Sequence, residues 1–230
     1  MKITSPVCLT LLSGLAMLFA SCASVSVKGV QNTDSAKPGK KPARIYVEPF
    51  AVERTSVKEH PMRKNPGALK IEARDLVAKY LVKELSKHVA PASLISRGSR
   101  PGRSGWLVAG EFTRLNEGSR FMRMAVGLGM GGTKMETRVA VRNLPAKNRP
   151  FLTFSTTGGS GAGPGAATNP IPFSSAPTAL IASKSGITDD AERTARMITA
   201  EIAQYAAERG WIPAASVPRT KRAREAATSR

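Results

Sequence analysis

Three consecutive segments between residues 106 and 157 alternate apolar and polar side chains, and this alternation most constrains the fold. A period of two is typical of a strand that buries one face. In "TKMETRVAVRNL" at 133–144, the apolar face carries Met135, Thr137, Val139 and Val141. The neighbouring segments are "WLVAGEFTRL" at 106–115 and "PFLTFSTT" at 150–157. Strands that follow one another in this way predict an antiparallel meander with one half-exposed face.

Two amphipathic helices are predicted on either side of these strands. The first covers 68–90, ends before Pro91, and has the apolar stripe Leu69, Ala73, Leu76, Val77, Tyr80, Leu81 and Leu85. The second begins near Asp189, which Glu192 follows at capping-box spacing, and has the apolar face Ala191, Ala195, Ile198, Ile202, Tyr205 and Ala206. Short strands are expected at 43–52 and 92–96. This order favours an α/β (α+β) fold, with a mixed, largely antiparallel sheet and two amphipathic helices packed on one face.

The first 21 residues have the layout of a secretory signal peptide, because Lys2 precedes an uncharged apolar run. "FASC" at 19–22 resembles the lipobox of bacterial lipoproteins, in which the Cys receives a diacylglycerol and becomes the new N-terminus. Cys22 is therefore the expected lipid attachment site, and an ordinary signal peptide with an incidental Cys is the alternative. Neither Ala23 nor Ser24 is the Asp that retains such proteins in the inner membrane. We therefore expect the outer membrane, on its periplasmic side.

Four parts of the chain follow from these patterns. Residues 1–21 are the signal peptide, and the polar, small residues of 22–42 are expected to form a flexible tether. Residues 43–212 suffice for a single α/β domain with one core. Residues 213–230 are basic and are expected to be disordered.

The chain is strongly basic, with 35 Lys and Arg against 16 Asp and Glu and a formal net charge of +19. Such a surface attracts anions, which in an envelope are phospholipid headgroups, lipopolysaccharide phosphates and acidic glycans. A basic composition without a dedicated partner is the alternative. Aromatic residues are only 5%, so stacking platforms for nucleic acid are scarce, and no nucleic-acid partner is expected.

Gly127, Gly129 and Gly132 spell the G-x-G-x-x-G of dinucleotide-binding loops. That motif needs a helix directly after it, whose N-terminus faces a pyrophosphate. Here a strand pattern follows instead, so no nucleotide is expected and the glycines are interpreted as a strand-to-strand connection. A weaker alternative is an anion-binding concavity formed by these glycines with Arg120 and Arg123.

No other constellation indicates catalysis. "GGSGA" at 158–162 approaches a nucleophile elbow, but the two His residues, His60 and His88, precede it and no His follows. Two His and no C-x-x-C are too few for a zinc site once Cys22 is lipidated. We therefore predict no catalytic residue, no metal and no cofactor.

The stretch "VAGEFTRLNEGSRFMRMAVGLGMGGTKMETRVAVRN" resembles an uncharacterised domain-of-unknown-function family of bacterial envelope lipoproteins. The resemblance covers about 43–210, and its specific features are Gly110, Gly118, Arg120, Arg123 and the Gly127–Gly129–Gly132 cluster. The family implies no particular activity. The element order is also similar, at the level of the fold, to small α/β lipoproteins that activate peptidoglycan synthases or build curli-type secretion channels.

Two functions are consistent with these features. One is a lipid-anchored, non-enzymatic interaction or assembly protein, whose partner is an envelope protein or an anionic envelope polymer. The other is a binding domain or enzyme for an anionic ligand, which would use the Arg/Gly-rich connection at 118–134 and an acid such as Glu111. The sequence does not indicate an oligomeric state.

Overall fold

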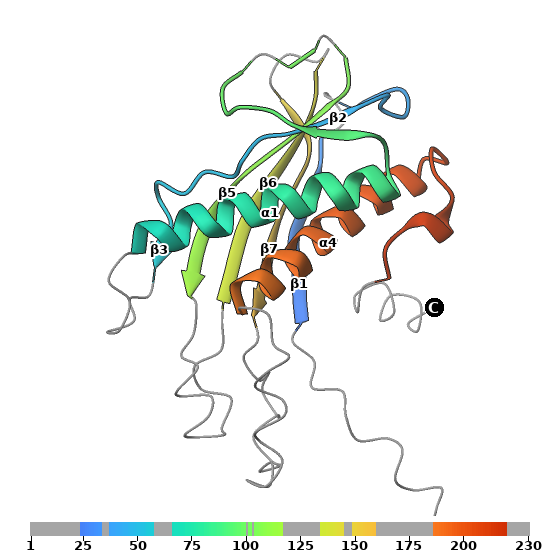
Figure 1. Cartoon of the computed structure of the whole chain (residues 1–230). Helices are drawn as coiled ribbons and strands as arrows, with labels where there is room; N and C mark the ends of the chain where they lie inside the picture. The colour runs from blue at the N-terminus through green and yellow to red at the C-terminus, as the bar shows by residue number, and fades with distance from the viewer. Residues whose placement is uncertain are drawn as a thin grey trace, which may run out of the picture.

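Both long helices lie on one face of a mixed seven-stranded sheet (Figure 1). The computed structural model describes residues 24–33, 37–57, 66–99, 101–102, 104–116, 134–144, 149–159 and 186–219. Within them, the strands are β1 (Ser24–Asn32), β2 (Ile45–Val47), β3 (Ser56–Val57), β4 (Ala92–Leu94), β5 (Trp106–Asn116), β6 (Lys134–Asn143) and β7 (Pro150–Gly159). The helices are α1 (Pro66–His88), α4 (Gly186–Ala207) and the short 3-10 helix η5 (Ala214–Ser216).

The sheet combines an antiparallel half with a parallel half, in the order β1-β7-β6-β5-β2-β4, and β3 also pairs with β5. The predicted meander is confirmed, because β5, β6 and β7 pair antiparallel and Val139 lies between Gly110 and Phe154. On the other side, β2 pairs parallel with both β4 and β5. A parallel pair needs a crossover connection, and α1 supplies it between β2 and β4.

The hydrophobic core lies between the sheet and the two helices. Met135, Thr137, Val139 and Val141 of β6 are all buried, as their alternation predicts. Five members of the predicted α1 stripe are also buried, namely Leu69, Ala73, Val77, Leu81 and Leu85. The predicted apolar face of α4 is buried along its whole length. The fold class expected from the sequence is therefore correct.

The expectation of a flexible tether is wrong for Ser24–Asn32. These nine residues form β1, which pairs antiparallel with β7 at the edge of the sheet. Val25 and Val27 are each 7% exposed, whereas Ser26 and Lys28 between and beside them point outward. The sequence does alternate apolar Val25 and Val27 with polar Ser26 and Lys28. Small polar residues are common both in linkers and on exposed strand faces, so this alternation alone did not indicate a strand.

Two further boundaries differ from the sequence expectations. Helix α4 begins at Gly186, so Asp189 lies in its first turn and is not the residue that precedes the helix. The expectation of disorder from 213 is wrong for Ala214–Ser216, which form η5, and the carbonyl of Ser216 accepts a hydrogen bond from His88 Nδ1 at 2.7 Å. Among the described residues, no helix is long and apolar enough to cross a membrane.

Candidate functional site

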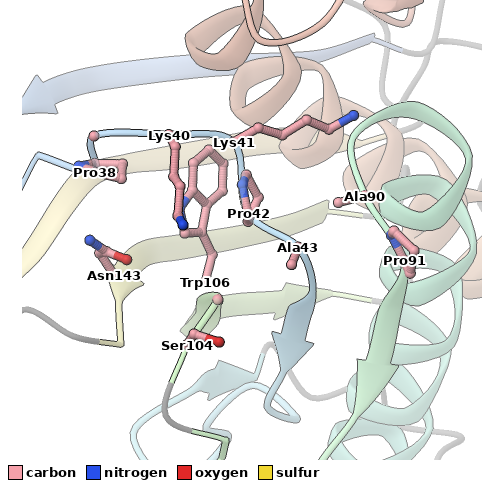
Figure 2. A pocket seen from close by; sticks show the side chains of 12 residues that line it. Pro38, Lys40, Lys41, Pro42, Ala43, Ala90, Pro91, Ser104, Trp106 and Asn143 are labelled. Carbon is pink, nitrogen blue, oxygen red and sulfur yellow. The ribbon is translucent and has the colours of Figure 1, made fainter.

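An open groove with a volume of about 820 Å³ lies at the end of the sheet where β5 begins and β6 ends (Figure 2). The two strands meet there, because Trp106 of β5 pairs with Asn143 of β6. Four separate parts of the chain contribute its lining: Pro38, Gly39, Lys40, Lys41, Pro42 and Ala43; Ala90 and Pro91; Ser104, Gly105 and Trp106; and Asn143. The site therefore exists only in the folded chain.

One wall of the groove is the segment 37–44, here called the strap, which connects β1 to β2 across the end of the sheet. A backbone hydrogen bond holds its C-terminal end, from Trp106 N to Arg44 O at 3.0 Å. Pro38 and Pro42 are buried and fix the backbone before this point. No backbone-to-backbone hydrogen bond of the described residues involves positions 38–43.

The floor of the groove is rigid because Trp106 belongs to a cluster of four aromatic rings. The Trp106 ring centroid lies 4.9 Å from that of Phe151, 6.1 Å from that of Tyr205 and 5.9 Å from that of Trp211. The Arg209 guanidinium carbon lies 3.5 Å from the centre of the Tyr205 ring, which adds a cation–π contact. The cluster joins β5 and β7 to α4, so the floor is continuous with the core.

Gly105 lets the strap approach the start of β5 closely. A Cβ at this position would lie 2.5 Å from the carbonyl oxygen of Arg44, and the φ of +120° is one that other residues rarely adopt. A side chain here would push the strap away from Trp106. The glycine therefore sets the width of the groove at its base.

The charge of the groove lining is positive. Its two ionisable side chains are Lys40 and Lys41, both exposed, and the lining contains no Asp or Glu. Neither lysine forms an ion pair with a described residue. In Figure 2, Lys40 lies beside Trp106 and the groove, whereas Lys41 extends to the other side of the strap. The groove thus combines apolar walls of proline and alanine with a cation that forms no ion pair with a described residue.

The site residues expected from the sequence fall elsewhere. Cys22, Arg120, Arg123, Gly127, Gly129 and Gly132 all lie outside the described residues. The ends of the Arg/Gly-rich connection are described, and Asn116 pairs directly with Lys134 at the end of the sheet opposite the groove. Glu111 lies mid-strand, where its carboxylate accepts a hydrogen bond from Arg138 Nη1 at 2.7 Å. Among the described residues, no three His, Cys, Asp or Glu side chains gather as a metal site would require.

Comparisons with known proteins give a family and a set of distant structures. A PelC dodecamer from Paraburkholderia phytofirmans has a TM-score of 0.36 and 12% identity, over 60% of this chain and 85% of that one. The crystal structure of an uncharacterized protein has a TM-score of 0.34 and 11% identity, over 72% of this chain and 93% of that one. No curated protein sequence matches. The profile of the "Domain of unknown function (DUF4410)" matches residues 45–220, which confirms the resemblance to an uncharacterised family, and the chain belongs to that family.

Proposed function

We propose that this chain is a lipid-anchored interaction or assembly protein of the bacterial envelope that has no catalytic centre of its own. The observation that carries the proposal is the start of β1 at Ser24, two residues after the lipobox Cys22. A lipid on Cys22 would therefore attach to the end of a paired strand and not to a long linker. An anchor of this kind holds the folded body against the membrane in a fixed orientation.

The register of the sheet defines which end would face the membrane. Ser24 of β1 pairs with Gly159 of β7, which pairs with Lys134 of β6, which pairs with Asn116 of β5. These four residues form one row, so the Arg/Gly-rich connection leaves and re-enters the sheet beside the anchor. The excess of Lys and Arg over Asp and Glu suits a position next to anionic headgroups.

The opposite end of the sheet would face away from the membrane. Strand β5 has 11 residues, and at about 3.3 Å per residue it spans roughly 33 Å from Asn116 to Trp106. The groove beside Trp106 is thus held at about this distance from the anchored end. An interaction protein needs such an arrangement, in which one end is fixed to the lipid and the other is available to a partner.

Mass spectrometry of the protein extracted from membranes tests the anchor. We expect a chain that begins at Cys22 and carries acyl additions, found in the membrane fraction. The matched control is Cys22→Ser, which keeps the size of the side chain, removes the thiol and should yield an unacylated chain. A wild-type product that is cut elsewhere, or that retains a free thiol at Cys22, would contradict the proposal.

A further inference from the structure

We infer that the groove between the strap and β5 binds a short acidic peptide segment of a partner protein. This inference rests on the proposed function and names the surface and the partner chemistry through which such a protein would act. Three features of the groove carry it: the charge of its lining, the backbone N–H groups of Lys40, Lys41 and Ala43, and the rigidity of its floor.

The charge selects an anionic occupant. Lys40 lies beside the groove with no ion-pair partner among the described residues, and no carboxylate lines the groove to neutralise it. A lysine ammonium is a compact point charge that forms charge-assisted hydrogen bonds with carboxylates. Lys41 also lines the groove, but its side chain extends to the other side of the strap, so Lys40 supplies the positive charge beside Trp106. An acidic side chain of a ligand would therefore give Lys40 an ion-pair partner that the described residues do not supply.

The backbone of the strap favours a peptide over a small anion. Lys40, Lys41 and Ala43 each carry a backbone N–H, and none of these groups is in a backbone-to-backbone hydrogen bond of the described residues. Backbone N–H groups without a partner can donate hydrogen bonds to the carbonyl groups of a peptide, which a small anion does not carry. Pro38 and Pro42 hold the strap in place, which lowers the entropy that ordering it would cost on binding.

The apolar walls of the groove would contact the nonpolar side chains that lie between the acidic residues of the peptide. Pro42, Ala90 and Pro91 present nonpolar surface on two sides of the groove, while Ser104 and Asn143 offer polar groups at its base. Because Trp106 is only 1% exposed and is fixed by the aromatic cluster, the floor need not rearrange when a ligand binds. The expected occupant is thus an extended peptide in which acidic and small apolar residues are mixed.

Fluorescence anisotropy of the full-length protein in detergent tests the inference. The probe is a fluorescein-labelled peptide of alternating glutamate and alanine, and the control probe replaces each glutamate with glutamine. We expect the acidic probe to bind and the amide probe to bind at least about tenfold more weakly, a difference that corresponds to about 1.4 kcal/mol. Binding should also weaken as salt is raised, because screening shortens the reach of the lysine charges.

Two double variants with the same change of net charge locate the binding. Lys40→Gln with Lys41→Gln removes the groove cations, whereas Lys79→Gln with Lys83→Gln removes two exposed lysines of α1 that do not line the groove. We expect the first pair to weaken binding about tenfold and the second to change it less than about twofold. An equal loss in both pairs, or no loss in the first, would overturn the inference. Since all four lysines are partly or fully exposed surface residues, these variants should fold.

A third variant blocks the groove without changing its charge. Ser104→Phe places a ring at an exposed position of the lining and should abolish binding while circular dichroism and the melting temperature stay as in the wild type. Retained binding would contradict a site in the groove. Polygalacturonate is added as a competing acidic glycan, and binding of this polymer without binding of the peptide would also overturn the inference. The Cys22→Ser protein should bind the peptide equally well, so failure of the anchor and failure of the groove are separate results.

Discussion

The ring of Phe50 lies directly over Gly110 in β5. A Cβ at Gly110 would be 2.7 Å from Phe50 Cε2 and 2.7 Å from the carbonyl oxygen of Arg138. Phe50 is 1% exposed and its ring centroid lies 5.8 Å from that of Phe112. Phe50, which lies three residues after the end of β2, therefore packs on the sheet only because β5 has no side chain at this point. Gly110 is one of the residues on which the family resemblance rests, and its role in the structure is in packing.

Gly110→Ala should destabilise the protein by about 1–3 kcal/mol, because an extra methyl in a filled core displaces either the ring or the backbone. The measurement is the free energy of unfolding in urea. The matched control is Gly39→Ala, since a Cβ at Gly39 would meet nothing within 4 Å. That variant should be neutral or slightly more stable. Equal stability of the two variants would show that the Phe50 contact is not tight.

Thr137 and Thr156 form a hydrogen bond between their hydroxyl groups at 2.7 Å in the otherwise apolar face of the sheet. Each residue is 1% exposed, so Thr137→Val leaves the Thr156 hydroxyl buried without this partner. We expect a loss of about 1–3 kcal/mol in the free energy of unfolding.

The double variant Thr137→Val with Thr156→Val removes both hydroxyls at nearly constant shape. Replacing both partners by apolar groups is often close to neutral, so the double variant should be more stable than the sum of the single losses predicts. The full double-mutant cycle measures this coupling directly. Strict additivity of the two single losses would mean that the hydroxyls do not interact.

Among the carboxyl groups that the structure describes, Glu53 has a pKa that is lowered from its ordinary value of 4.5. The largest cause is a hydrogen bond from its own backbone N–H, and Arg97 adds an ion pair and a further hydrogen bond. Because the folded-state pKa is lowered, the stabilising contribution is present above the ordinary value and is lost as the pH falls through the folded-state pKa.

An NMR titration of the Glu53 side chain should therefore give a pKa below 4.5. Arg97→Gln should raise that pKa only part of the way, because the backbone hydrogen bond remains. A complete return to the ordinary value would assign the shift to Arg97 alone.

Much of the fold could be predicted from the sequence, because the responsible signals are local and periodic. The alternation in 133–144 and the stripe from Leu69 to Leu85 each bury one face against the core. Local pattern did not separate β1 from a linker, since Val25 and Val27 are too few to distinguish an edge strand from a polar segment. Pairing with β7 decides between the two, and it joins residues that are at least 120 positions apart.

The groove could not be predicted from any motif. Lys40, Pro91, Ser104 and Asn143 come together only through the parallel placement of β2 between β4 and β5. The one local signal was the run of Pro38, Lys40, Lys41 and Pro42, in which prolines stiffen a basic segment. In a stretch interpreted as a tether, that run looks like ordinary linker composition.

Because Ser24–Asn32 form a strand that is paired with the sheet, shortening the side chains on its buried face should destabilise the domain. Val25 and Val27 pack against the core from β1, and each is 7% exposed. Val25→Ala with Val27→Ala removes four buried methyl groups, and at about 0.8 kcal/mol per buried carbon the free energy of unfolding should fall by roughly 3 kcal/mol. A flexible tether would lose nothing.

Lys28→Ala provides the control for the β1 variant, because Lys28 is exposed on the same strand and should change the stability by less than about 0.5 kcal/mol. Hydrogen exchange adds a second readout, in which the amides of β7 that pair with β1 should lose protection in the double variant. If the double variant is as stable as the wild type, β1 does not pack on the core, and the segment after Cys22 is not fixed to the sheet. The lipid would then be joined to the domain through a loose segment, and the fixed orientation of the groove relative to the membrane would be lost with it.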